Sequence, residues 1–190
     1  MRAYVDHVLA LLPFEPAALE RLKGPSATYV GHRLADSIAA LNPKPSPLPQ
    51  SGPKRLVVLP GSRASELKKM LQIYGDTLGV LRQRGVEFEA IIPAVPHLKQ
   101  RLIEQTEHWS VKPTIVDSAD NAETFASAHA ALATSGTVVL ELALHRVPTV
   151  TGYRLDSLAR LFSGLIDAWS ALLPNLIVDR VLVPEEHNEM

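Results

Sequence analysis

The stretch RLVVLPGSRASELKKMLQIYGDTLGVLRQRG, residues 55–85, decides the fold of this chain. It opens with a short apolar run, residues 55–59, that is typical of a buried strand. A tight turn at Pro60, Gly61 and Ser62 follows. Beyond the turn, apolar side chains recur at helical spacing until Gly85. The stretch therefore predicts one unit of strand, turn and helix.

The same alternation continues towards the C-terminus. It predicts strands at residues 87–92, 114–116, 130–133 and 149–152, and helices at 97–107, 121–128 and 138–145. Strands that alternate with helices across short turns favour an α/β fold with a doubly wound parallel sheet. Such a sheet binds its ligands at the carboxyl ends of its strands.

The flanks of this region are less regular. Before it we expect a strand at residues 3–14, a helix at 15–23, a strand at 28–31 and a helical turn or two at 34–41. Residues 42–53 hold five prolines, a composition typical of an extended linker and of a domain boundary. A further helix is expected at 155–171. The chain then stops at residue 190 without a cap, as if the second domain, residues 54–190, were truncated there.

Composition excludes several classes of function. The 19 Lys and Arg against 20 Asp and Glu leave a net charge of −1, which argues against nucleic acid as a partner. The absence of cysteine removes disulfides and thiolate chemistry and fits a reducing cytoplasm. No apolar run approaches the ~20 residues of a membrane span, so we expect a soluble, cytoplasmic chain.

The turn LPGSRASE, residues 59–66, is the first candidate site. Gly61 lets the backbone pass close to a ligand, and the amino terminus of the next helix offers free N–H groups to an anion. Arg63 adds a guanidinium that suits phosphate oxygens. The structural alternative is a capping turn in which Ser62 works with Ser65 or Glu66. Both interpretations remain open at this point.

The turn TSGTVVLE, residues 134–141, repeats the pattern after another strand. Ser135, Gly136 and Thr137 supply hydroxyls and backbone donors at a helix start. Glu141 lies among apolar residues, where an ionised carboxylate needs a partner. The two hydroxyls of a ribose would provide one; the alternatives are an exposed helix end or pairing with Arg146 or Arg154.

Two weaker candidates lie late in the chain. Asn175 in LLPN can bind a ligand, although Asn after Pro more often forms a turn. Tyr153 or Arg154 in GYR can reach the same crevice. The histidines form no metal-binding pattern, and the acidic group at residues 117–123 is better explained as a loop and helix start, so we expect no metal and no cofactor.

Six stretches stand in an order and spacing that resemble those of the lipid-A-disaccharide synthases. They are LLPFE (11–15), YVGHRLAD (29–36), LPGSRASE (59–66), ATSGTVVLELAL (133–144), PTVTGYR (148–154) and LPNLI (173–177). The resemblance covers essentially the whole chain. It implies the Rossmann-like C-terminal lobe of a two-lobed GT-B glycosyltransferase, with residues 1–41 as a remnant of the N-terminal lobe.

The resemblance also implies a reaction. It is an inverting transfer from UDP-2,3-diacylglucosamine to 2,3-diacylglucosamine 1-phosphate, which gives a β-1,6-linked disaccharide and UDP without a metal. In this family's pattern Gly61, Ser62, Arg63, Ser135, Gly136 and Thr137 lie near the donor diphosphate, Glu141 at the ribose and Asn175 near the nucleotide. Arg63 would stabilise the departing UDP and so acts in catalysis.

The resemblance further implies peripheral contact with the cytoplasmic face of the inner membrane and a possible homodimer. The acceptor site and general base would belong to the lobe that this chain largely lacks, so the isolated chain is expected to be inactive. Two alternatives stay open. A UDP-sugar epimerase of the same architecture would need no lipid acceptor, and a non-catalytic nucleotide-binding module would bind UDP without turnover.

Overall fold

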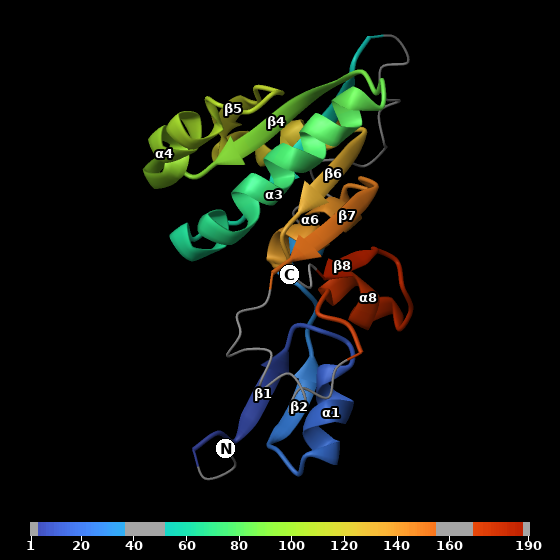
Figure 1. The fold of residues 1–190 in the computed structure, drawn as a ribbon. Helices are drawn as coiled ribbons and strands as arrows, with labels where there is room; N and C mark the ends of the chain where they lie inside the picture. Colours follow the sequence, from blue (N-terminus) through green and yellow to red (C-terminus); the bar gives the residue numbers. More distant parts are fainter. Residues whose placement is uncertain (1–3, 37–51, 155–168, 188–190) are drawn as a thin grey trace.

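A six-stranded, all-parallel sheet organises the chain in the computed structural model, which describes residues 4–36, 52–154 and 169–187 (Figure 1). The strand order is β5-β4-β3-β6-β7-β8. The strands are β3 (Lys54–Leu59), β4 (Phe88–Ala94), β5 (Thr114–Asp117), β6 (Ala130–Ala133), β7 (Thr149–Tyr153) and β8 (Glu185–His187).

The strand order contains one reversal. From β3 the chain moves outward through β4 to β5, then returns to the other side of β3 and moves outward again through β6, β7 and β8. This is the order of dinucleotide-binding sheets, in which the crevice between the two central strands receives the ligand. The predicted α/β, doubly wound parallel sheet is therefore confirmed. The two turns singled out above follow β3 and β6, the strands on either side of the reversal.

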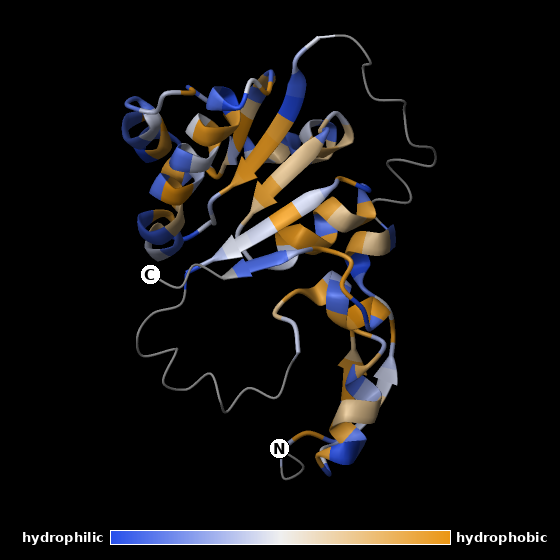
Figure 2. Cartoon of the chain, turned by 45° about the vertical axis from the view of Figure 1, so that its right-hand side comes forward, coloured by the Kyte–Doolittle hydropathy of each residue, from blue (hydrophilic) through white to orange (hydrophobic). Residues whose placement is uncertain are grey.

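Helices cover both faces of the sheet. Their bounds are α3 (Ala64–Gln83), α4 (Pro96–Thr106), α5 (Asn121–Ala126) and α6 (Thr137–Leu144). The residues of β3 divide between the faces. Leu56 and Val58 pack in one core with α3 and α4, whereas Val57 and Leu59 pack in a second core with α5 and α6. Because both faces of β3 are covered, its residues 56–59 are all apolar (Figure 2).

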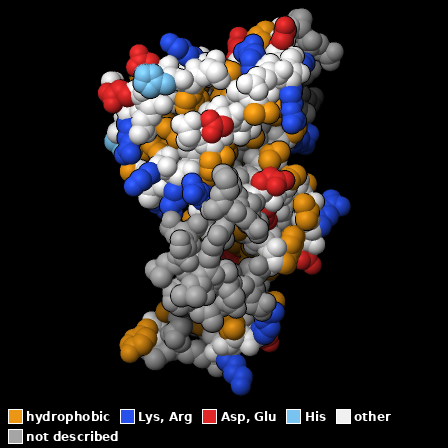
Figure 3. Space-filling model, in the orientation of Figure 1, with side chains coloured by type: hydrophobic (Ala, Val, Ile, Leu, Met, Phe, Trp, Pro, Cys, Tyr) orange, Lys and Arg blue, Asp and Glu red, His pale blue; other side chains and the backbone are white. Residues whose placement is uncertain are grey.

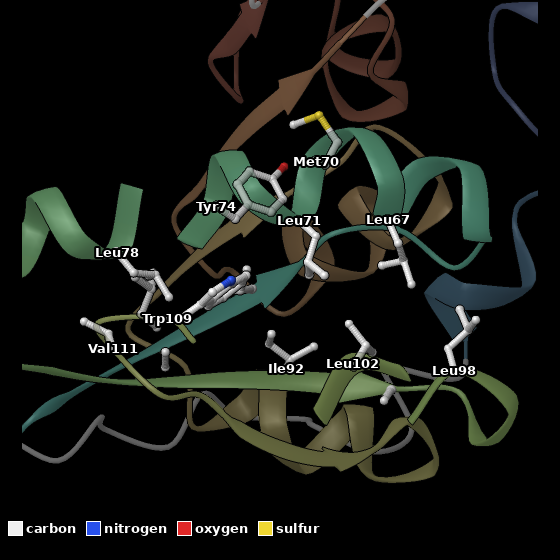
Figure 4. Close-up of a cluster of buried hydrophobic side chains, with 14 of the residues drawn as sticks. Leu67, Met70, Leu71, Tyr74, Leu78, Ile92, Leu98, Leu102, Trp109 and Val111 are labelled. Carbon is white, nitrogen blue, oxygen red and sulfur yellow. The ribbon is translucent and has the colours of Figure 1, made fainter. Parts of the chain in front are cut away.

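The helix α3 contributes five buried side chains to the first core. Figure 4 shows Leu67, Leu71 and Leu78 pointing from α3 towards Ile92 of β4. These side chains are 6% exposed or less. The helical periodicity in residues 67–81 is thus the stripe that buries α3 on the sheet, as the sequence predicts.

The first described residues form a separate small unit. The strands β1 (His7–Ala10) and β2 (Ser26–Tyr29) pair in parallel around α1 (Glu15–Arg21), apart from the large sheet and at the far end from α4 (Figure 1). The strand expected at 3–14 is shorter, because the backbone turns after residue 10 and the Glu15 carboxylate accepts a hydrogen bond from the Leu12 N–H at 2.8 Å.

The last described residues depart from expectation. The helix predicted at 155–171 falls mostly on residues 155–168, outside the described part, and residues 169–172 are not helical. A short helix, α8 (Leu173–Val178), and the strand β8 follow, and β8 pairs with β7. The sequence analysis missed β8, because its residues Glu185, Glu186 and His187 carry no apolar pattern.

Other expectations fall partly outside the described residues. Of the helical turns expected at 34–41, residues 33–36 are helical and residues 37–41 are not described; most of the proline segment, 42–51, is also outside. Among the helices that the structure describes, none is long and apolar enough to cross a membrane. On the face drawn in Figure 3, acidic and basic side chains are interspersed.

Candidate functional site

A cavity of about 430 Å³ opens where the strand order reverses. It lies at the carboxyl ends of β3, β4 and β6, between the two turns predicted to bind phosphate. All of the residues assigned to those turns line it, and Glu141 does too. The lining residues that carry the site are Gly61, Ser62, Arg63, Glu66, Ala94, Val95, Leu98, Asn121, Ser135, Gly136, Thr137 and Glu141.

The turn after β3 holds an internal carboxylate. One oxygen of Glu66 accepts hydrogen bonds from the N–H groups of Ser62, at 2.8 Å, and Arg63, at 3.2 Å. The other oxygen accepts a charged hydrogen bond from Arg63 Nη1 at 2.7 Å. Of the two interpretations of this turn, the capping one is realised through Glu66, and the helix begins after Arg63 rather than after a Ser62 cap.

Gly61 makes this arrangement possible. Its φ of 112° lies in a region that favours glycine. A β-carbon at this position would also overlap the side chain of Glu66. The carboxylate therefore folds over the turn only because residue 61 has no side chain.

The turn after β6 is built differently. Thr134 is buried and donates its N–H to the Leu59 carbonyl at 2.9 Å, which ties the end of β6 to the end of β3. Gly136 precedes the first residue of α6, and the Ser135 hydroxyl reaches the Ala171 carbonyl at 3.4 Å. Within the described residues no side-chain acceptor caps α6, and Gly136 and Thr137 at its start line the cavity.

Glu141 is the second acid of the site. It lies on α6 between the buried residues Leu140 and Leu142 and lines the cavity. Within the described residues its carboxylate makes no hydrogen bond or ion pair, so neither Arg146 nor Arg154 neutralises it there. Burial raises the pKa of Glu141, since desolvation disfavours the charged form. A ligand with hydroxyl donors would relieve this cost.

Tyr74 supports the second turn from α3, and sequence analysis treated it only as a core residue. Its hydroxyl lies 3.3 Å from Thr134 Oγ1 and 3.3 Å from the Gly152 carbonyl. Burial raises the pKa of Tyr74 to about 12, although both hydrogen bonds act in the opposite direction. A tyrosine within an apolar helical stripe was the available signal, because its hydroxyl needs a polar partner once buried.

The cavity also has an apolar side that the sequence analysis did not identify. Ala94, Val95 and Leu98 line it after β4. Asn121, at the start of α5, also lines the cavity, and its side-chain oxygen is buried without a hydrogen-bond partner among the described residues. An apolar wall beside an unsatisfied amide suits a flat heterocycle with polar edges. An Asn after a strand and a 3₁₀ turn gave no recognisable motif.

Asn175 lies elsewhere. It is 1% exposed and does not line the cavity. Its amide nitrogen donates to the Val183 carbonyl at 2.9 Å, and its oxygen accepts the N–H groups of Leu182 and Val183 at 2.9 and 2.8 Å. The amide is thus engaged in holding α8 to the segment before β8. It is neither a simple turn former nor, in this arrangement, available to a nucleotide.

The remaining candidates do not join the site. Tyr153 and Arg154 are not among the residues that line the cavity. Within the described residues, no group of three or more His, Cys, Asp or Glu side chains is placed to hold a metal ion. The acidic residues at 117–123 form the 3₁₀ turn and helix start predicted for them, with Asp117 accepting the Ala119 N–H at 2.9 Å.

Known proteins resemble this chain over nearly its whole length. The chain is 47% identical to a lipid-A-disaccharide synthase of Rhodopseudomonas palustris, strain BisB18, over 189 residues. It is 44% identical to that of Nitrobacter winogradskyi and 33% to that of Ruegeria pomeroyi. Each alignment covers 97% of this chain but only 48 or 49% of the relative, so the chain spans about half the length of the curated relatives it matches.

A family model matches the same span of the chain. A sequence model of lipid-A-disaccharide synthetase aligns with residues 1–189. The resemblance inferred from the six motifs is therefore confirmed at the level of the family, and it agrees with a parallel sheet whose strand reversal carries the two motif turns. This chain belongs to the lipid-A-disaccharide synthetase family.

Proposed function

We propose that this chain is the donor-binding part of an inverting glycosyltransferase of lipid A biosynthesis. The full-length enzyme would join UDP-2,3-diacylglucosamine to 2,3-diacylglucosamine 1-phosphate and release UDP. The observation that carries the proposal is the cavity at the strand reversal, which brings both motif turns and the unpartnered Glu141 together in a member of this family.

The diphosphate would lie between the two turns. The turn at Ser135, Gly136 and Thr137 lines the cavity at the start of α6, and in the described part of the chain no side chain caps that helix. The opposite turn contributes the amides of Ser62 and Arg63 and the guanidinium of Arg63, which is 77% exposed and free to reorient. Donors on two sides suit a ligand with two phosphate groups.

The nucleoside would occupy the rest of the cavity. Glu141 would accept hydrogen bonds from both ribose hydroxyls, which satisfies a half-buried carboxylate that lacks a partner within the described chain. The base would rest against the apolar side formed by Ala94, Val95 and Leu98, with its polar edge towards Asn121. We assign Asn175 to holding α8 against the segment before β8 rather than to contacting the ligand.

Catalysis in this half of the enzyme would stabilise the leaving group. Negative charge develops on the diphosphate as UDP departs, and a planar guanidinium can hold two of its oxygens as that charge grows. The acceptor site and general base would lie in the half of the relatives that this chain does not match, so the isolated chain transfers no sugar. Membrane contact and a homodimer belong to the same proposal for the full-length enzyme.

Calorimetry tests the binding half of the proposal. The 190-residue chain should bind UDP weakly, with or without EDTA, because no metal takes part and no second lobe closes over the ligand. Binding that requires a divalent cation, or no binding to UDP at millimolar concentrations, would contradict it.

Enzyme kinetics test the catalytic half. In the full-length enzyme, Arg63→Lys should lower turnover by about tenfold or more while changing the donor KM less, because lysine lacks the two-pronged geometry that strengthens in the transition state. Normal turnover with a raised donor KM would assign Arg63 to ground-state binding instead. Product analysis with both acylated sugars distinguishes glycosyl transfer, which forms the disaccharide together with UDP, from epimerisation or hydrolysis of the donor, which forms no disaccharide.

A further inference from the structure

The carboxylate of Glu66 occupies the place where the proposed function needs a phosphate. Its two oxygens accept the N–H groups of Ser62 and Arg63 and the guanidinium of Arg63 at 2.7 to 3.2 Å. These are the donors of the turn that would hold an anionic ligand. In geometry and charge, the Glu66 oxygens stand in for two oxygens of a phosphate group.

We propose that Glu66 is an internal anion that leaves this turn when the diphosphate binds. Two negatively charged groups cannot share the same three donors, because like charges at this separation repel and each donor is already used. Glu66 must therefore rotate away as the ligand arrives, and Arg63 exchanges a carboxylate for a phosphate. The proposal rests on the proposed function of this cavity.

The surroundings of Glu66 permit this exchange. Its side chain is 18% exposed and that of Arg63 is 77% exposed, so both can move towards solvent without disturbing the core. Gly61 beneath the carboxylate has no side chain to hold it in place. Because Arg63 is largely exposed, water screens its ion pair with Glu66, and a ligand with more charge and more contacts can displace the carboxylate.

The exchange would also set specificity. An isolated anion such as inorganic phosphate gains only the donors of this turn, and it must displace Glu66 to reach them. UDP gains the opposite turn, the ribose contact and the base contact as well. The cost of displacing Glu66 is the same for both ligands, but UDP offsets it with these further contacts, whereas an isolated small anion does not.

Calorimetry on three proteins tests this inference. The proteins are the unaltered chain, Glu66→Gln and the control Asp76→Asn, which removes the charge of an exposed carboxylate on the same helix that accepts a hydrogen bond from Gln72. Glu66→Gln should bind inorganic pyrophosphate and phosphate about three- to tenfold more tightly, on the scale of a partly exposed ion pair. Affinity for uridine, which has no phosphate, should not change, and Asp76→Asn should behave as the unaltered chain.

A spectroscopic measurement keeps the inference testable if Glu66→Gln loses stability. In the unaltered chain, amide NMR signals of Ser62 and Arg63 and the side-chain carboxyl signal of Glu66 should shift with UDP or pyrophosphate and stay in place with uridine. Equal or weaker pyrophosphate binding by Glu66→Gln, or a UDP complex in which the Glu66 carboxyl signal is unchanged, would overturn the inference. If the unaltered chain and Glu66→Gln both fail to bind UDP, the proposed function is contradicted, and this inference is contradicted together with it.

Discussion

The two turns at the strand reversal look alike in sequence and differ in structure. Each places a glutamate five residues after a glycine, Glu66 after Gly61 and Glu141 after Gly136. Glu66 is satisfied by three donors of its own turn, whereas Glu141 has no partner within the described residues. The difference follows from the backbone. Gly61 lets Glu66, the third residue of α3, fold back over its turn, while Glu141 is the fifth residue of α6 and lines the cavity.

Before a ligand binds, the donors of the first turn are therefore occupied by the Glu66 carboxylate, whereas Glu141 does not occupy the donors of the second turn. The first must give up an internal anion, and the second already holds a carboxylate at a desolvation cost. Burial raises the pKa of Glu141, whereas Glu66 is stabilised by charged hydrogen bonds. Four substitutions test whether the two turns differ in this way.

The largest effect is expected from Asn175→Ala. This change would leave the buried N–H of Val183 and the part-buried N–H of Leu182 without their acceptor, at a cost of about 2 to 4 kcal/mol in the free energy of unfolding. Asn175 also donates to Ser170, next to the Ala171 carbonyl that the Ser135 hydroxyl contacts. Hydrogen exchange should therefore rise around residues 134–137 and not around 61–66. Denaturant unfolding measures the loss of stability, and amide exchange measures the local effect. An equal rise in exchange at residues 61–66 and 134–137 would contradict the prediction.

The next effect is expected from Glu141→Ala on ligand binding. The loss of a carboxylate that accepts from ribose should weaken UDP by about 1.5 to 3 kcal/mol and leave inorganic pyrophosphate unchanged. Titration calorimetry with both ligands makes the measurement. Parallel losses for UDP and pyrophosphate would show that Glu141 supports the turn rather than the sugar.

A smaller effect is expected from Asn121→Ala. Its unsatisfied amide is proposed to meet the polar edge of the base, so uridine and UDP should each weaken by about 1 kcal/mol, as for one neutral hydrogen bond. Pyrophosphate should bind as before. A variant that binds uridine normally would remove Asn121 from the nucleoside site.

The smallest effect concerns stability and pH. Because the folded chain raises the pKa of Glu141 above its unfolded value, the favourable contribution of the protonated acid is present at low pH and is lost as pH rises through the folded pKa. Glu141→Gln should thus be more stable than the unaltered chain at about pH 7.5, by ~0.5 kcal/mol, and equal to it near pH 4. Thermal unfolding at the two pH values checks this, and a greater benefit at low pH would reverse the sign.

Much of the sheet could be predicted from local pattern. The strand at 130–133 has the expected bounds, and β3, β4, β5 and β7 agree within two residues at each end. The two turns and Glu141 also lie together at one cavity, as their positions after neighbouring strands suggest. In contrast, β8 was missed, since EEH becomes a strand only by pairing with β7. Whether Ser62 or another residue caps α3 also depended on which side chain reaches the turn.

By itself, the sequence determined the alternation of strands and helices, the glycine turns and the family motifs, because periodicity and turn chemistry are local properties of the chain. Only the tertiary structure decided which of the two acids is already paired, that Asn175 serves α8 and β8, and that Tyr74 and Asn121 belong to the neighbourhood of the cavity. These features depend on contacts between segments or on the rotamer that a side chain adopts over its own turn. Such contacts and rotamers produce no periodic pattern in the sequence.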